Sequence, residues 1–149
     1  SCPGGWAQVA SKVIYTGKIL SIDIKQMEPV NNTKFLKCDI FNQLTEEKIK
    51  NFFQGKLDVI ISDMAADTTG SQSLDSIRTN QLCSKVLNLA SKILKPRGVI
   101  VSKLFMVEDF LEVKNLAKSL FREVNFFKPE SSRNESKETY LHCKIFNTL

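Results

Sequence analysis

Leu57-Asp58-Val59-Ile60-Ile61-Ser62-Asp63-Met64 is a short apolar run, rich in β-branched residues, that ends abruptly at an acid. Its length and composition predict a strand buried on both faces of a sheet rather than a helix. Ligands of open α/β sheets bind beyond the carboxyl ends of the strands, so Asp63 lies where a functional group is expected. The alternative is that Asp63 only caps the following loop.

The composition limits the classes of protein that fit. A chain of 149 residues, 42% of them hydrophobic, can form one domain with one core, and we expect a single domain over residues 1–149. The net charge of +5 suits a protein that binds phosphate backbones, although many basic proteins bind none. The four cysteines form no C-x-x-C motif and there is one histidine, so we expect free thiols and no metal site. No apolar run approaches the ~20 residues of a membrane span, and we expect a soluble intracellular protein.

Strand-like and helix-like segments alternate along the chain. Strands are predicted at residues 18–23, 35–40, 57–64, 99–105, 123–127 and 139–146, and helices at 6–13, after an N-cap at Thr45, around 82–93 and at 110–120, with a turn at 95–98. This order predicts an α/β fold, with a mostly parallel sheet and helices on both faces. The last two strands, joined by a polar loop, should be antiparallel. A Gly turn opens the first helix with no strand before it, so we expect the natural sheet to have its central strand upstream.

Acids follow three successive predicted strands: Asp23, Asp39 and Asp63. Asp23 lies about 18 residues after Gly5, close to the spacing at which a carboxylate accepts hydrogen bonds from a ribose diol. The next acid could accept from an adenine amine. The G-x-G-x-x-G pattern is absent, so an adenosyl group without a pyrophosphate fits better than NAD. The alternative for each acid is a loop cap.

Lys103 interrupts an apolar strand. Burying a lysine is costly unless it is paired, and we expect burial to lower its pKa. Asp63, on the adjacent strand, is the natural partner, and a lysine tuned in this way could act as, or orient, a general base. The alternatives are a lysine that extends from the strand end into water and, for Glu138, a solvated acid at the end of a loop.

Four motifs follow one another along the chain: Pro3-Gly4-Gly5-Trp6-Ala7-Gln8, Ser62-Asp63-Met64-Ala65, Lys103-Leu104-Phe105 and Ser131-Ser132-Arg133-Asn134-Glu135-Ser136-Lys137-Glu138-Thr139-Tyr140. In these motifs the sequence resembles the FtsJ/RrmJ (RlmE-like) family of ribosomal RNA ribose 2′-O-methyltransferases. The resemblance implies a Rossmann-like methyltransferase fold. It also implies contacts to S-adenosyl-L-methionine from Gly4, Trp6, Asp23, Asp39 and Asp63. Asp63, Lys103 and Glu138 would be three members of the family's Lys-Asp-Lys-Glu tetrad, whose first lysine lies upstream of the Gly turn.

The implied reaction is methylation of a ribose 2′-hydroxyl, which we expect to belong to a uridine of large-subunit ribosomal RNA. We expect the RNA to lie across Lys128, Arg133 and Lys137, and we expect a monomer in the cytoplasm, or alternatively in mitochondria. The alternatives are a transfer RNA or mRNA cap methyltransferase, a non-catalytic RNA-binding relative and an NAD(P)-dependent oxidoreductase. Ala65-Ala66-Asp67 replaces the family's usual Ala-Pro-Asn, which should relax that loop.

Overall fold

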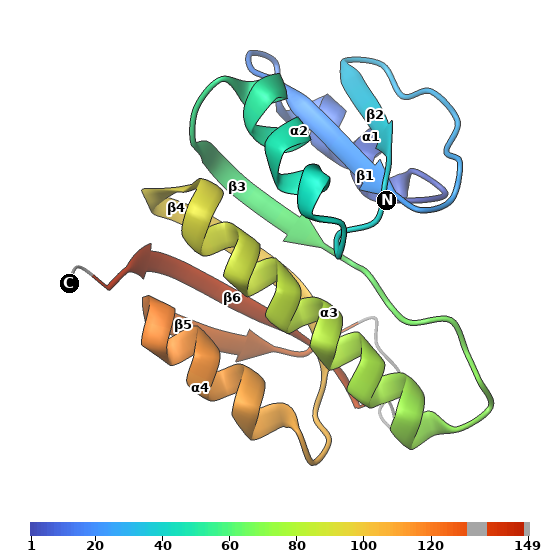
Figure 1. Ribbon diagram of the computed structural model, residues 1–149, viewed down its shortest axis with the longest axis vertical. Helices are drawn as coiled ribbons and strands as arrows, with labels where there is room; N and C mark the ends of the chain where they lie inside the picture. Colours follow the sequence, from blue (N-terminus) through green and yellow to red (C-terminus); the bar gives the residue numbers. More distant parts are fainter. Residues whose placement is uncertain (131–136, 148–149) are drawn as a thin grey trace. The chain divides into compact units, whose positions relative to one another are not determined.

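A computed structural model describes residues 1–130 and 137–147 and gives a chain in which helices and strands alternate (Figure 1). The chain consists of two compact units, Ser1–Gly55 and Lys56–Leu149. Within the described residues, no helix is both long enough and apolar enough to cross a membrane.

The first unit contains a two-stranded parallel sheet. Its elements are α1 (Gly5–Val13), β1 (Ile19–Asp23), β2 (Thr33–Lys37) and α2 (Gln43–Phe53). The predicted strand at 35–40 was placed too late, because the side chain of Asp39 accepts a hydrogen bond from the Phe41 N–H at 2.9 Å and turns the backbone there.

Asn42, not Thr45, is the N-cap of α2. The Asn42 side chain accepts a hydrogen bond from the Leu44 N–H at 2.9 Å. Thr45 lies inside the helix, is buried, and donates its hydroxyl to the Asp39 carbonyl at 2.6 Å. Both residue types are good caps, and the burial of Thr45 decides between them.

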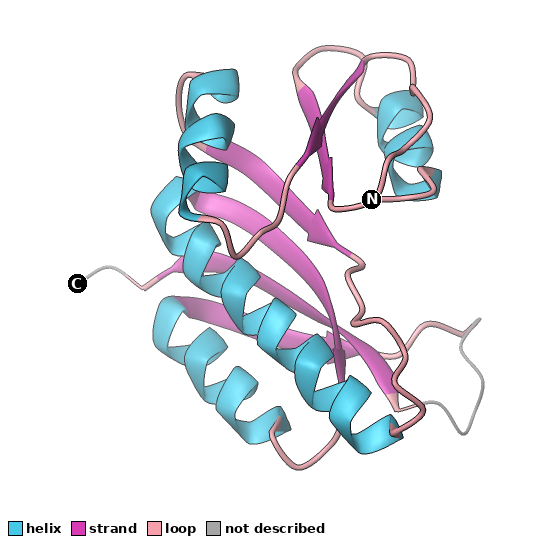
Figure 2. Cartoon of the chain, turned by 45° about the vertical axis from the view of Figure 1, so that its right-hand side comes forward, coloured by secondary structure: helices cyan, strands magenta, loops and turns pink. Residues whose placement is uncertain are grey.

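The second unit contains a four-stranded sheet in the order β3-β4-β6-β5. Its elements are β3 (Leu57–Ser62), α3 (Gln72–Ile93), β4 (Leu94–Phe105), α4 (Phe110–Leu120), β5 (Phe121–Phe127) and β6 (Glu138–Phe146). β3 and β4 are parallel, and β6 runs antiparallel to both β4 and β5, so the predicted antiparallel pair at the end of the chain is confirmed. Figure 2 shows α3 and α4 side by side on one face of this sheet.

β4 begins earlier than predicted, at Leu94, and includes residues 95–98 in place of the predicted turn. Its pairing with β3 shifts register between Leu57 and Val59, as in a β-bulge. Gly98 lies in this irregular part of the strand. A Cβ atom at Gly98 would come within 2.4 Å of the buried Leu94 side chain, so this approach requires glycine.

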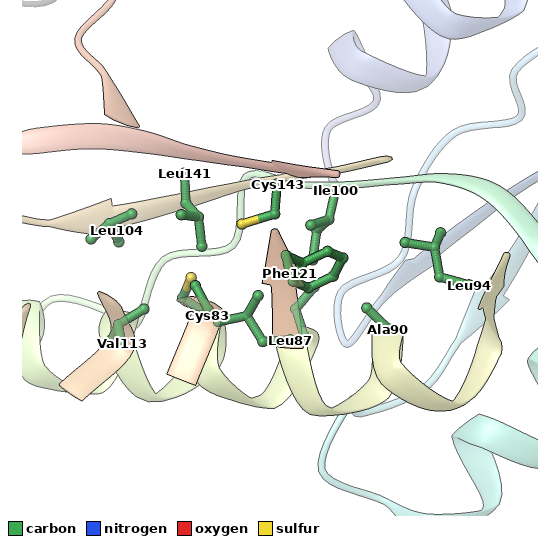
Figure 3. Packing of buried hydrophobic residues seen from close by; sticks show 12 residues of the cluster. Cys83, Leu87, Ala90, Leu94, Ile100, Leu104, Val113, Phe121, Leu141 and Cys143 are labelled. Carbon is green, nitrogen blue, oxygen red and sulfur yellow. The ribbon is translucent and has the colours of Figure 1, made fainter. Parts of the chain in front are cut away.

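The core of the second unit lies between its sheet and the two helices (Figure 3). Leu87 of α3, Ile100 of β4 and Leu141 of β6 are fully buried there. The face of β3 that points away from this core is more exposed to solvent: Val59 and Ile61 are 54% and 45% exposed. The prediction that this strand is buried on both faces is therefore wrong, since both helices of the unit cover the same face.

Candidate active site

Lys103 lies between two carboxylates at the carboxyl end of β4. Its ammonium nitrogen is 2.9 Å from Oδ1 of Asp63 and 3.3 Å from Oε2 of Glu138. The pairing of Ser62 with Ser102 brings the residue after β3 beside Lys103, and Glu138 arrives from β6 opposite Phe105. Three predicted catalytic residues therefore meet at one point of the sheet.

The charge state of Lys103 differs from the prediction. Its side chain is 13% exposed, and this burial by itself lowers the pKa. Hydrogen bonds and negative charge from Asp63 and Glu138 outweigh burial, so the pKa of Lys103 lies above its ordinary value. The predicted lowering is wrong, and Lys103 is an ammonium ion at neutral pH. An ammonium can donate hydrogen bonds and stabilise negative charge, but it cannot accept a proton.

Tyr140 also belongs to this group, although it was not among the site residues predicted from the sequence. Its hydroxyl donates a 2.7 Å hydrogen bond to Oδ1 of Asp63, the same oxygen that Lys103 contacts. Tyr140 lies directly opposite Lys103 in the β4–β6 ladder and two residues beyond Glu138. The period of two in a strand, which places Glu138 and Tyr140 on one face, could have revealed it. We call Asp63, Lys103, Glu138 and Tyr140 the Lys103 cluster.

Asn80, in the middle of α3, holds the end of β4 that carries Lys103. Its fully buried side chain accepts from the Phe105 N–H at 2.8 Å and donates to the Phe105 carbonyl at 3.0 Å. It also donates to Asp109 at 2.7 Å, which links β4 to the residue that precedes α4. These three bonds fix the backbone two residues beyond Lys103.

The loop after Asp63 is held by a hydrogen bond where the family usually has proline. The Ala66 N–H donates to the hydroxyl of Thr79 on α3 at 3.1 Å, and that hydroxyl donates to the Asp75 carbonyl at 2.9 Å. A proline has no N–H to donate. The expected loosening of this loop is therefore offset by a contact that proline could not make.

The predicted donor-binding residues Gly4, Asp23 and Asp39 belong to the first unit. Oδ2 of Asp23 accepts a hydrogen bond from the Cys2 N–H at 2.7 Å, and Oδ1 accepts from the Lys25 N–H at 2.9 Å. These bonds join the Gly turn to the end of β1.

Gly4 is buried with a φ of 127°, which only glycine adopts easily, and it lies against Met27. Trp6 is 37% exposed on the first turn of α1. Asp39 follows β2, the parallel neighbour of β1, so Asp23 and Asp39 lie at the same end of this small sheet. Asp23 and Asp39 also accept hydrogen bonds from backbone N–H groups of the turns that follow them, as an acid that caps a loop would do.

Two of the three residues expected to contact RNA belong to the part of the chain that the structure describes. Lys128 follows β5 and Lys137 precedes β6, and both are exposed. The Lys137 carbonyl accepts from the Met106 N–H at 2.9 Å, which joins it to the end of β4. Arg133 lies outside the described residues.

Comparison with known proteins identifies the family. The sequence profile of the FtsJ-like methyltransferases matches residues 1–146. The chain belongs to the FtsJ-like methyltransferase family. It is 44% identical over 143 residues to the ribosomal RNA large subunit methyltransferase E of Pelagibacter ubique, and 44% identical over 147 residues to that of Rickettsia akari. These alignments cover 96% and 95% of the chain, but 70% and 65% of the two relatives, so the relatives are longer.

Solved structures show the same fold. A crystal structure described as a ribosomal RNA methyltransferase of Plasmodium falciparum superposes with a TM-score of 0.82 at 28% identity, over 97% of this chain and 82% of that one. A structure described as an rRNA methylase of Clostridium thermocellum has the same fold, with a TM-score of 0.64 at 10% identity. The FtsJ-like chain therefore has the Rossmann-like methyltransferase fold that was predicted. Its family favours a methyltransferase over the dinucleotide-dependent oxidoreductase alternative.

Proposed function

We propose that this protein transfers a methyl group from S-adenosylmethionine to a ribose 2′-hydroxyl of large-subunit ribosomal RNA, and that the target is a uridine. The observation that carries the proposal is the Lys103 ammonium, which is nearly buried and held by Asp63 and Glu138. Removing the charge of Lys103 from water is costly unless it is paired, and charged groups held in this way gather at functional sites. The large-subunit ribosomal RNA methyltransferases among the relatives supply the substrate class.

The chemistry of the first unit fits an adenosyl group. Carboxylates at the ends of neighbouring parallel strands can accept hydrogen bonds from a ribose diol and from an adenine amine, roles we assign to Asp23 and Asp39. We assign Gly4, whose positive φ only glycine adopts easily, to the same donor. We assign Trp6 to the same donor, and Asp63 to both the donor and the reaction.

S-adenosylmethionine, when bound, supplies a methyl group already activated by its sulfonium sulfur. The ammonium of Lys103 donates a hydrogen bond to the attacking ribose oxygen, which orients it and stabilises the negative charge that develops there. The bound donor would supply the methyl group to the ribose oxygen and leave as S-adenosylhomocysteine, while a carboxylate of the cluster, Asp63 or Glu138, would accept the hydroxyl proton. Tyr140 keeps Asp63 in place through its 2.7 Å hydrogen bond.

We assign RNA phosphates as the partners of Lys128 and Lys137, which follow β5 and precede β6, and of Arg133. The relatives of Pelagibacter ubique and Rickettsia akari are bacterial, which supports a cytoplasmic site of action. We further propose that residues 1–149 act as one domain and that the protein works as a monomer.

The proposal is tested with the full-length protein, S-adenosylmethionine labelled on the methyl group, and large ribosomal subunits or naked ribosomal RNA from bacteria that lack this methyltransferase. Digestion to nucleosides should yield labelled 2′-O-methyluridine. Lys103→Met should reduce turnover by about 10²-fold or more with unchanged donor affinity, because one charge-stabilising donor is lost. The control is Lys118→Met, which removes an exposed lysine of α4.

Other outcomes identify the alternatives. Label that appears in transfer RNA or in capped mRNA but not in ribosomal RNA would move the substrate to one of those classes. Donor binding without transfer to any RNA would indicate a non-catalytic relative. Turnover of Lys103→Met at the wild-type rate would show that Lys103 does not take part in the reaction.

A further inference from the structure

Phe127 is an exposed aromatic ring next to the Lys103 cluster. It is the last residue of β5 and is 46% exposed, although phenylalanine is among the residues most often buried. One side of its ring stacks on Tyr140, with centroids 5.7 Å apart and an interplanar angle of 22°. The Thr139 hydroxyl donates to the Phe127 carbonyl at 2.8 Å and fixes its backbone. The ring is therefore held in place by its neighbours while much of its surface faces solvent.

Phe127 and Lys103 lie in register across the sheet, with Tyr140 between them. Tyr140 pairs with Lys103 on one side and with Phe127 on the other. Residues paired across neighbouring strands point to the same face, and strands lie about 4.8 Å apart, so the Cα atoms of Phe127 and Lys103 are about 10 Å apart. That separation is about the size of one nucleotide.

We propose that Phe127 is a stacking platform for an unpaired base of the RNA substrate, at or next to the nucleotide whose ribose contacts Lys103. This inference rests on the proposed function and adds to it a recognition site. Sequence-tolerant binding of single-stranded RNA combines exposed aromatic rings with positive charge. Lys128 follows Phe127 directly and supplies that charge. Single exposed apolar side chains are ordinary on protein surfaces, but this one is fixed, stacked on the cluster and beside a lysine.

The structure also predicts the form of the substrate. A base inside an RNA helix is stacked on both faces, so a base that stacks on Phe127 lies at the end of a helix or in an unpaired segment, and we infer an unpaired one because such bases are the ones that aromatic side chains commonly bind. The platform should therefore contribute to RNA binding and not to the binding of S-adenosylmethionine.

The test compares Phe127→Ala, Phe127→Leu and Phe127→Trp in the full-length protein, on whichever ribosomal RNA substrate the wild type methylates. Leucine keeps apolar packing against Tyr140 but cannot stack on a base, and tryptophan restores stacking. We expect the alanine and leucine variants to raise KM for RNA about tenfold and to leave KM for S-adenosylmethionine unchanged, while tryptophan stays near wild type. Tyr15→Ala is the matched control, because it removes another exposed aromatic ring, 90% exposed and in the other unit.

A wild-type KM for RNA in Phe127→Leu would overturn the inference. So would a lower kcat with unchanged KM for RNA, because that result would mean the ring acts only by packing on Tyr140. If the wild type methylates no ribosomal RNA, both the proposed function and the role of Phe127 are refuted. If the wild type is active and Phe127→Leu has the same KM for RNA, only the role of Phe127 is refuted.

Discussion

Replacing Tyr140 by phenylalanine removes a single hydroxyl from the Lys103 cluster and leaves the ring in place. Tyr140 is 8% exposed, its hydroxyl donates to Asp63 at 2.7 Å, and its ring stacks on Phe127. The substitution therefore deletes one charge-assisted hydrogen bond and little packing.

The magnitude follows from the surroundings of that bond. A hydrogen bond to a charged group contributes about 1.5–3 kcal/mol. The Asp63 side chain is 35% exposed and keeps Lys103 at 2.9 Å, so water can replace part of the lost contact and the lower end of the range applies. We expect Tyr140→Phe to lose about 1–1.5 kcal/mol of unfolding free energy and about 3–5 °C in Tm.

The same bond predicts a pH dependence. Burial and then the hydrogen bond to Asp63 raise the pKa of Tyr140 above its ordinary value of 10.0. The folded protein keeps this proton at a pH where the unfolded chain loses it, so the hydroxyl stabilises the fold fully below about pH 10 and less as pH rises further. The stability difference between wild type and Tyr140→Phe should therefore narrow above pH 10.

Urea unfolding of both proteins at pH 7.5 and at pH 10.5 measures this difference, with an unchanged m-value as the sign that only stability has altered. Tyr15→Phe is the control, because it removes the hydroxyl of the chain's other tyrosine, which is 90% exposed. Equal stability of Tyr140→Phe and wild type at pH 7.5 would refute the reasoning, as would a difference that stays constant into the alkaline range.

Two further predictions concern the second unit's interior. Burial raises the pKa of Cys83 to about 11 and that of Cys143 to about 12, so iodoacetamide at pH 8 should modify the exposed Cys2 and spare both buried thiols until the protein unfolds; rapid native labelling of either, measured by mass spectrometry, would contradict this. Asn80→Ala should lower the free energy of unfolding by about 2–4 kcal/mol, because it removes the three hydrogen bonds of a buried side chain. Asn88→Ala, at an exposed position of the same helix, should change it by less than about 0.5 kcal/mol. Similar denaturation midpoints for the two variants would show that the hydrogen bonds of Asn80 are dispensable.

The sequence predicted the alternation of elements and the antiparallel end because those depend on local periodicity. It also singled out Lys103, since a lysine breaks the apolar pattern of its strand, and Asp63, since an acid ends the preceding one. The raised pKa of Lys103 could not be predicted, because it depends on carboxylates that two other segments bring within 3.3 Å. Tyr140 and Asn80 escaped notice for a related reason. A tyrosine in a strand and an asparagine in a helix are ordinary until their long-range partners are known.

Two other wrong predictions, the N-cap of α2 and the burial of β3 on both faces, also have tertiary causes. Asn42 and Thr45 are both competent caps, and only the burial of Thr45 against the Asp39 carbonyl assigns the cap to Asn42. The exposure of Val59 and Ile61 depends on which face of the sheet the helices cover, and the apolar character of the strand does not reveal that choice.

We propose that the Lys103 cluster catalyses the methylation of a ribose of ribosomal RNA. Mass-spectrometric mapping of ribose methylation tests it most directly, in large-subunit RNA from bacteria that lack their own methyltransferase E and carry the full-length wild-type protein or Lys103→Met. We expect one additional 2′-O-methylated nucleotide, a uridine, with the wild type and its loss with Lys103→Met at equal protein abundance. The same methylated nucleotide at full occupancy with Lys103→Met, or no added methylation with the wild type, would contradict it.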